Sequence, residues 1–220
     1  MGSRARLYLP ALAIASLLAL AGIASSHHGA GAATGPQPIS AQARRAGLTF
    51  DRTVAQGDRQ VVLDAIASAQ PPARALIGLV DGLVDVHVGP TGDHSVGLTQ
   101  SGGSRYVVTF DLGTVAARYG QRGIERLVLH ELGHVVDFAL VPEWLDRELD
   151  AGIPPGLGCD EGVLGGCADR RERFAETFAK WALGDIGVNL NIGYKVPPPR
   201  LPLEAWGAPL ARLATQAPAG

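Results

Sequence analysis

The chain has 220 residues, enough for one domain of ordinary size with terminal extensions. Hydrophobic residues make up 46% of it and charged residues 18%, which is typical of a globular protein with a sizeable core. The formal net charge is -2, so the composition gives no electrostatic reason to expect a nucleic-acid partner.

The N-terminal segment is basic at its start and then apolar. Arg4 and Arg6 precede an apolar stretch from Leu7 to Ala24. This order, ending in small residues, is typical of a secretory signal peptide, with a cleavage site expected after Ala24. A retained membrane anchor is the alternative, because the stretch is near the minimum length for a membrane span. We therefore expect residues 1–24 to be a signal peptide or N-terminal anchor, and the mature protein to be secreted or extracytoplasmic at the cell surface.

Residues 25–46 are rich in Ala, Gly, Ser, Gln and Pro, and this composition predicts a flexible linker. Residues 47–220 are expected to form one domain. Hydrophobic spacing and turn residues predict its elements in chain order. These are helices over Asp58–Ala69 and Ala73–Leu79, strands over Leu83–Val88, Ser95–Thr99 and Tyr106–Leu112, helices over Arg122–Leu140, Glu143–Leu149 and Asp169–Leu183, and a short helix near the C-terminus.

The two cysteines of the chain are Cys159 and Cys167. Export places a protein in an oxidising compartment, so a disulfide that closes this short loop is the first expectation. Two free thiols, or a cysteine ligand to a metal ion, are the alternatives.

The segment HELGH, His130 to His134, is an HExxH match inside a predicted helix. Residues four apart lie on one helix face one turn apart, so both imidazoles can reach the same metal ion. Glu131 is rotated by about 100° from His130 and can stand beside the metal without binding it. Zinc activates a bound water, and a neighbouring carboxylate can take its proton and pass it to a leaving amine. The segment predicts two Zn2+ ligands and a general base, although a hydrogen-bonded structural His pair has the same spacing.

A catalytic zinc site needs a third protein ligand and one open position. Leu140 stands six residues after His134, where the metzincin class has its third histidine, so that class is excluded. The remaining candidates are Glu172 and Glu176, which are four apart on one face of the last long predicted helix. Asp169 and Glu172 also fit a capping box, and Glu176 also fits a plain surface carboxylate.

Two neighbouring features bear on this site. Ala175 and Ala179 lie on the same side as the two glutamates and are small enough to let this helix approach the HELGH helix closely. Asp137 lies seven residues after His130 on the same helix face. It is a candidate to accept a hydrogen bond from a ligand histidine, which would orient that ring. A plain carboxylate near the helix end is the alternative.

The combination of HELGHxxD with a separate helix carrying ExFAExFA resembles the gluzincin metallopeptidases, and more narrowly the catalytic domain of the anthrax lethal factor family. The resemblance covers roughly residues 105–183 and is specific only at these two helices. It implies an α+β zincin-like fold, in which a small mixed sheet packs on the HExxH helix beside a second, Glu-bearing helix. It also implies that Glu172 is the third zinc ligand and that Glu176 contacts a ligand rather than the metal.

The same resemblance implies that an edge strand of the sheet holds the peptide substrate in extended form, and the strands over Leu83–Val88 and Tyr106–Leu112 could supply that sheet. One feature departs from the family, which has a catalytic tyrosine about two turns before the ligand glutamate. Gly165-Gly166-Cys167 stand there instead. An oxyanion that develops during the reaction needs a donor besides zinc. The candidate replacements are Tyr194 and, less favoured, His87, His94 and Tyr106.

The leading hypothesis is an exported zinc-dependent metallopeptidase that acts on a peptide or protein substrate, with Glu131 as general base. The missing tyrosine motivates an alternative, a zinc-stabilised cell-surface binding protein on a peptidase scaffold with little or no turnover. Hydrolysis of a non-protein amide is a third reading that the residues do not separate from the first. A membrane is an expected partner only through an uncleaved N-terminal segment.

Overall fold

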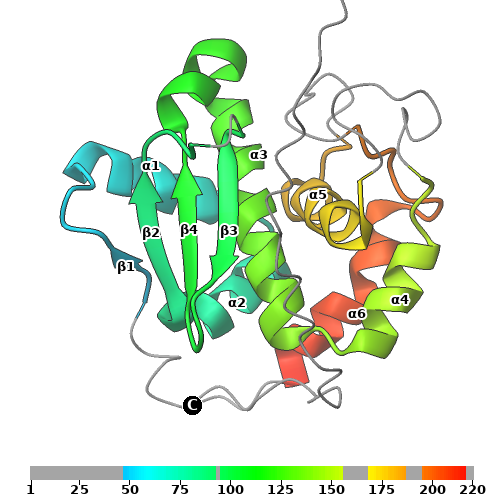
Figure 1. Cartoon of the computed structure of the whole chain (residues 1–220). Helices are drawn as coiled ribbons and strands as arrows, with labels where there is room; N and C mark the ends of the chain where they lie inside the picture. Colours follow the sequence, from blue (N-terminus) through cyan, green and yellow to red (C-terminus); the bar gives the residue numbers. More distant parts are fainter. Residues whose placement is uncertain (1–46, 93–94, 156–167, 187–194, 217–220) are drawn as a thin grey trace, which may run out of the picture. The chain divides into compact units, whose positions relative to one another are not determined.

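The computed structural model describes residues 47–92, 95–155, 168–186 and 195–216, and every structural statement below concerns these residues. Their fold is α+β, as expected, with the elements labelled in Figure 1. In chain order these are β1 (Thr49–Phe50), α1 (Gln56–Ala67), α2 (Pro71–Val80), the 3-10 helix η2 (Asp81–Leu83), β2 (Val84–Val88), β3 (Gly97–Ser101), β4 (Tyr106–Phe110), α3 (Leu112–Leu140), α4 (Glu143–Ala151), α5 (Arg170–Leu183) and α6 (Leu203–Gln216).

The strands form one mixed sheet in the order β1-β2-β4-β3. β1, β2 and β4 are parallel neighbours, whereas β3 runs antiparallel to β4. A tight turn joins β3 to β4, and in it the Gly102 N–H donates to the Arg105 carbonyl over 2.8 Å. In this order β3 is the edge strand on one side of the sheet, and it is the strand nearest to α3 in Figure 1.

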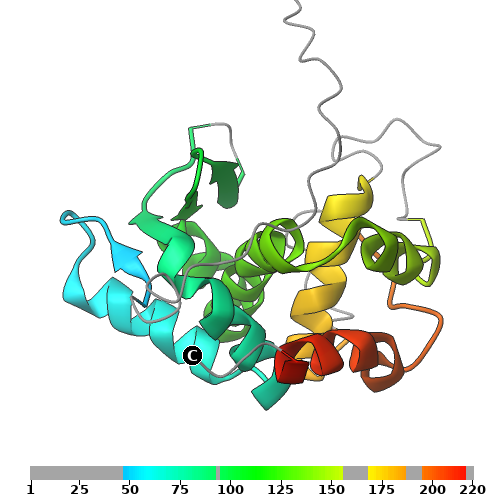
Figure 2. The ribbon, with the colours of Figure 1, turned by 90° about the horizontal axis from the view of Figure 1, so that it is seen from below.

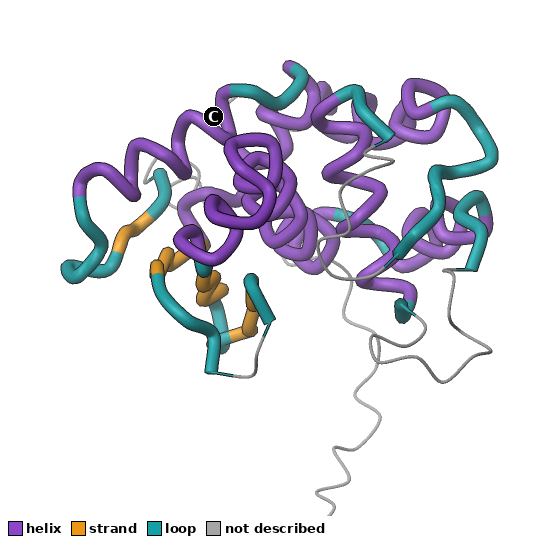
Figure 3. The backbone as a smooth tube through the Cα atoms, turned by 90° about the horizontal axis from the view of Figure 1, so that it is seen from above, coloured by secondary structure: helices purple, strands orange, loops and turns teal. Residues whose placement is uncertain are grey.

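Helix α3 is the centre of the fold, because it packs against the sheet on one side and against α5 on the other. Figure 2 shows α1 and α2 on the face of the sheet that is turned away from the viewer in Figure 1. Figure 3 shows the strands gathered on one side of the helices. Side chains of all these elements meet in one core, in which Val86, Phe110, Leu129, Leu132 and Phe178 are fully buried. Burial of apolar area on this scale is the main source of stability.

Several predicted boundaries differ from those in the structure by about two residues, and two elements, α3 and β3, differ in ways that affect the position of the HELGH segment and its neighbours. α3 begins at Leu112 rather than at Arg122, because the Asp111 side chain accepts a hydrogen bond from the Thr114 N–H over 3.0 Å and so caps a helix that starts where β4 ends. The two parts of α3 meet at a kink at Gly120, where φ is 63° and ψ is -159°. β3 occupies Gly97–Ser101, two residues later than predicted.

The close approach predicted for the two long helices is present. A Cβ added at Gly133 of α3 would lie 3.0 Å from a ring carbon of Phe178 and 3.3 Å from the Ala175 Cα. The helix α5 also has the predicted ends, with Asp169 as N-cap and Gly184 in the left-handed conformation as C-cap. Small residues at the crossing thus bring the HELGH turn of α3 directly against α5.

Among the described residues, no helix combines the length and apolar character needed to cross a membrane. The apolar stretch Leu7–Ala24 and the predicted linker lie outside the described residues, as do Cys159 and Cys167. The expectations for export and for a disulfide therefore stay predictions.

The packing of α6 on α5 depends on a glycine. A Cβ added at Gly207 would overlap atoms of the Trp181 indole, which is itself buried. Helix propensity alone favours Gly207→Ala by about 1 kcal/mol, but overpacking a tight contact costs about 1–3 kcal/mol. We therefore predict that Gly207→Ala lowers the free energy of unfolding, as measured by urea denaturation. Gly78→Ala is the matched control, because that helical glycine has nothing within 4 Å of an added Cβ.

Candidate metal centre

The HELGH segment forms little more than one turn in the second half of α3, and His130, Glu131 and His134 line a cavity. The rings of His130 and His134 lie 4.9 Å apart between centroids and are nearly perpendicular to each other. Glu131 and His134 are only 5% and 7% exposed. Two imidazoles and a carboxylate so deeply placed are costly unless they bind a partner, because burial removes their hydration.

The carboxylate that meets both rings belongs to Glu172 on α5. Its Oε2 lies 3.2 Å from Nε2 of His130 and its Oε1 lies 3.5 Å from Nε2 of His134. Of the two contacts in the predicted capping box, the structure has the one made by the Asp169 side chain. Asp169 Oδ1 accepts a hydrogen bond from the Glu172 N–H over 3.0 Å, so Asp169 caps the helix. The Glu172 carboxylate itself points to the histidines.

These three residues fit a divalent metal ion. One ligand atom from each of His130, His134 and Glu172 lies within 4.8 Å of the others. Zinc bound tetrahedrally at about 2.0–2.1 Å places its ligand atoms roughly 3.4 Å apart. The two Nε2–carboxylate distances, 3.2 and 3.5 Å, match that spacing. The two contacts use different oxygens of Glu172, and the three residues together could hold a metal ion.

Glu176 lies one turn further along α5 and contacts a ligand candidate from behind. Its Oε2 is 3.3 Å from Nδ1 of His130, whereas its Oε1 is 2.5 Å from Arg126 Nη2 and 3.5 Å from Lys180 Nζ. All three charged partners of this buried network are less than 5% exposed. Burial raises the pKa of Glu176, but the hydrogen bond to His130 and the charge of Arg126 move it below its usual range. An ionised Glu176 holds the proton of His130 on Nδ1. That leaves Nε2 free to bind a metal.

The charges of this site favour a protonated His130 in the absence of a metal. Burial by itself lowers the pKa of His130, but hydrogen bonds to Glu172 and Glu176 raise it to about 10. For Glu172, burial opposes ionisation, yet the hydrogen bonds to the two histidines move its pKa well below the usual range. A metal ion must displace the extra proton of His130, so metal binding at this site weakens as the pH falls.

Strand β3 fixes the position of Glu131. The Thr99 hydroxyl donates to Glu131 Oε2 over 2.7 Å. A Cβ added at Gly97 would overlap Oε1 of the same carboxylate and lie 2.6 Å from Leu127 Cδ1. The absence of a side chain at Gly97 thus lets β3 lie directly against the carboxylate. Sequence analysis did not identify these two residues, which act on Glu131 only through the tertiary fold.

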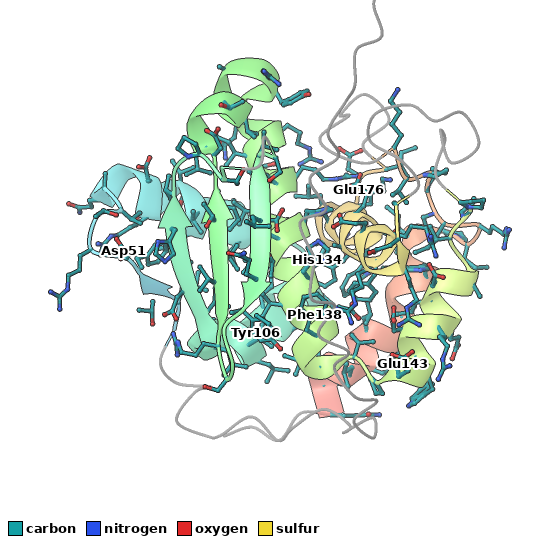
Figure 4. All side chains as sticks on the ribbon, in the orientation of Figure 1. Asp51, Tyr106, His134, Phe138, Glu143 and Glu176 are labelled. Carbon is teal, nitrogen blue, oxygen red and sulfur yellow. The ribbon has the colours of Figure 1, made fainter. Side chains whose placement is uncertain are left out.

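A cavity of about 470 Å3 runs over these groups between β3, α3 and α5. Figure 4 labels three residues of its wall, His134 and Phe138 on α3 and Glu176 on α5. Phe138 stacks on His134 with 5.9 Å between ring centroids. The wall of the cavity is formed by β3 and the loop before it, by both parts of α3 and by the start of α5. Its residues are Ser95, Val96, Gly97, Leu98, Thr99, Arg118, Tyr119, Arg126, Leu127, His130, Glu131, His134, Phe138, Asp169, Arg171, Glu172 and Glu176.

The two candidate oxyanion donors that the structure describes, His87 and Tyr106, do not line this cavity. Tyr194 and His94 lie outside the described residues. His87 on β2 and Tyr106 on β4 are described but are absent from the described wall of the cavity. Tyr119, Arg118 and Arg171 do line it, and sequence analysis missed all three. Recognising Asp111 as an N-cap would have placed Tyr119 on the same helix as HELGH.

Asp137 makes no hydrogen bond to either ring within the described part of the chain. His130 uses both ring nitrogens on Glu172 and Glu176, and Nδ1 of His134 is buried without a hydrogen-bond partner there. Asp137 instead lies near the carboxylate of Asp146. Burial first, and then the charge of Asp146, raise the pKa of Asp137 to about 7. Its predicted role in orienting a ligand histidine has no contact to support it.

The raised pKa of Asp137 predicts a pH-dependent stability of the metal-free protein. The folded state binds a proton on Asp137 that the unfolded state releases near pH 4, so this group destabilises the fold as the pH rises from about 4 to 7. Asp137→Asn removes that loss. We expect urea denaturation to show the variant gaining about 2–4 kcal/mol relative to the parent protein between pH 4 and pH 8. Asp64→Asn, at an exposed position on α1, should show no such gain.

Comparison of the chain with protein-family models, with curated proteins and with solved structures gives no match.

Proposed function

We propose that this protein is an exported zinc metallopeptidase of the zincin type, resembling the gluzincins. The observation that carries the proposal is the convergence of His130, His134 and Glu172 on one point, with Glu131 beside them and a cavity in front. Two histidines and a carboxylate are a ligand set that zinc accepts in catalytic sites, where one position stays open. Export is proposed on the N-terminal segment alone, and sequencing the N-terminus of the mature protein tests it.

The chemistry divides between metal and protein. When bound, zinc supplies Lewis acidity that makes a water molecule acidic and polarises a carbonyl oxygen. Glu131 accepts a proton on its carboxylate and then gives it to the leaving amine. Thr99 holds that carboxylate in one orientation. Glu176, flanked by Arg126 and Lys180, keeps the His130 ring in the orientation that ligation needs.

Among the described strands β3 lies at an edge of the sheet, and this position supports a peptide as the substrate. Val96 accepts a hydrogen bond from Asp111, and Gly102 donates one to Arg105, so in an antiparallel pair the residues at 96, 98, 100 and 102 pair with β4. The backbone groups of Gly97 and Thr99 then face away from β4, and the Gly97 carbonyl accepts a hydrogen bond from the Ser95 hydroxyl over 2.8 Å. A peptide added there in extended form would lie across the cavity. β2 and β4 supply the sheet, but they are interior strands.

The test of the proposal combines metal analysis with peptide cleavage. We expect the mature protein, purified without added metal, to contain close to one zinc per chain by mass spectrometry, and to cleave members of a broad peptide library. Removal of zinc with a chelator should abolish cleavage, and added zinc should restore it. Protein that stays free of zinc with both histidines intact would overturn the proposal.

A second function is supported by one observation, the position of the candidate oxyanion donors. Neither His87 nor Tyr106 reaches the described cavity wall. Removal of one such donor costs about 10²–10³ in turnover in enzymes that use them. A zinc-stabilised binding protein with little turnover is therefore the alternative. Zinc-loaded protein that binds peptides but leaves the library intact would favour it.

The contact between β3 and Glu131 yields a further prediction. Gly97→Ala should displace the Glu131 carboxylate, because the added methyl would overlap it. We expect peptidase activity to fall about 10- to 100-fold with zinc content unchanged, as for small misplacements of reacting groups. Gly57→Ala is the control, since nothing lies within 4 Å of an added Cβ there. Full activity of Gly97→Ala would show that β3 does not fix the base.

A further inference from the structure

The arginines of α3 and α5 divide into two kinds. Four of the six donate to carboxylates of the protein, Arg122 to Asp185, Arg126 to Glu176, Arg170 to Glu143 and Asp146, and Arg173 to Asp150. In the described part of the chain, the side chains of Arg118 and Arg171 form neither a hydrogen bond nor an ion pair. Both are exposed, and both line the cavity over the metal ligands. Guanidinium groups left unpaired in a cleft are suited to bind carboxylates of a ligand.

Arg171 is held in place by an aromatic ring rather than by an anion. Its guanidinium carbon lies 4.7 Å from the centroid of the Phe138 ring, which in turn stacks on His134 at 5.9 Å. A cation over an aromatic face is attracted to it and keeps its hydrogen-bond donors available. The charge of Arg171 lowers the pKa of three nearby carboxyls, those of Asp137, Glu143 and Asp146. The ion pairs of Glu143 and Asp146, however, are with Arg170.

The two arginines lie on opposite sides of the metal ligands. Arg171 lies beside Phe138, past His134 along α3, at no more than about 11 Å from the His134 ring. Arg118 lies twelve residues before His130, which would be about 18 Å along a straight helix, and the kink at Gly120 lies between the two. An extended peptide advances about 3.3 Å per residue, so Arg171 is within about three residues of the metal ligands and Arg118 within about five or six.

Resting on the proposed peptidase function, we infer that the cleft selects peptides with acidic side chains on both sides of the scissile bond, one bound by Arg171 and the other by Arg118. The metal ion adds positive charge between the two arginines. The wall carries three arginines, Arg118, Arg126 and Arg171, against four carboxylates, Glu131, Asp169, Glu172 and Glu176, so with a zinc ion bound its formal charge is +1. The attraction is between exposed charges, so it weakens as the ionic strength rises.

The test measures binding apart from turnover. Zinc-loaded Glu131→Gln protein is titrated into a fluorescein-labelled peptide. This peptide carries one Glu on each side of its central bond and no other charged side chain. The same peptide with Gln at both positions is the reference. We expect the Glu peptide to bind about tenfold more tightly at low salt, and Arg171→Gln or Arg118→Gln to reduce that ratio by about two- to fivefold each, the range of exposed ion pairs.

Arg212→Gln is the matched control, because this exposed arginine on α6 lies outside the cavity. Equal binding of the two peptides, or a ratio that Arg171→Gln and Arg118→Gln leave unchanged, overturns the inference, as does an equal effect of Arg212→Gln. The parent protein, assayed for cleavage of the same peptides, separates the two proposals. Preferred binding of the Glu peptide without cleavage would refute the peptidase alone, and equal cleavage of both peptides would refute the acidic preference alone.

Discussion

Glu131→Gln should retain zinc and lose peptidase activity by about 10³-fold, within the range that proton transfer by a positioned side chain contributes. The amide oxygen of Gln can still accept the hydrogen bond that Thr99 donates to Glu131, so the side chain should keep its place against β3. An amide cannot accept a proton from water near neutral pH, and it cannot return one to a leaving amine. The substitution therefore removes the proposed chemistry and leaves the packing.

The measurement pairs zinc content with the cleavage rate of a library substrate, for the parent protein and two variants. Glu125→Gln is the control on the same helix, because Glu125 pairs with Arg122 outside the cavity wall. It should keep both zinc and activity. Glu131→Gln protein that retains more than a tenth of the activity would show that Glu131 is not the base.

Features that lie within one helix could be predicted from the sequence. HELGH predicted a shared face for His130 and His134, and Asp169 and Gly184 marked the ends of α5. The glutamates of α5 could be placed on one face but not told apart, since periodicity gives direction and not distance. The structure separates them, because Glu172 meets both Nε2 atoms while Glu176 lies behind His130.

The contacts between distant segments were not accessible. Thr99 reaches Glu131 across 32 positions of the chain, and only the register of β3 against β4 decides which residues of β3 face that carboxylate. A shift of one residue in a strand turns its side chains to the other face. The predicted strand was two residues early, so Gly97 was counted as its middle instead of its start. The start of α3 was missed because Asp111 was not recognised as an N-cap, and the helix that it begins continues across the kink at Gly120.

The last prediction separates Glu172 from Glu176 by two measurements on the same variants, metal affinity and the stability of the metal-free protein. Glu172→Gln should weaken zinc binding by more than about 100-fold, because it removes a ligand, whereas loss of a residue behind a ligand costs about 10- to 100-fold. Its effect on metal-free stability should be smaller than that of Glu176→Gln, since the Glu172 side chain is 27% exposed and His130 keeps Glu176 as a partner.

Glu176→Gln should show the opposite balance. It leaves Arg126 and Lys180 buried without their shared anion, and breaking a buried ion pair costs about 3–5 kcal/mol. We expect urea denaturation of the metal-free variant to show a loss of that size, while zinc affinity falls by no more than about 100-fold. If Glu176→Gln instead loses zinc more completely than Glu172→Gln and keeps its stability, then Glu176 is the third ligand and Glu172 supports it.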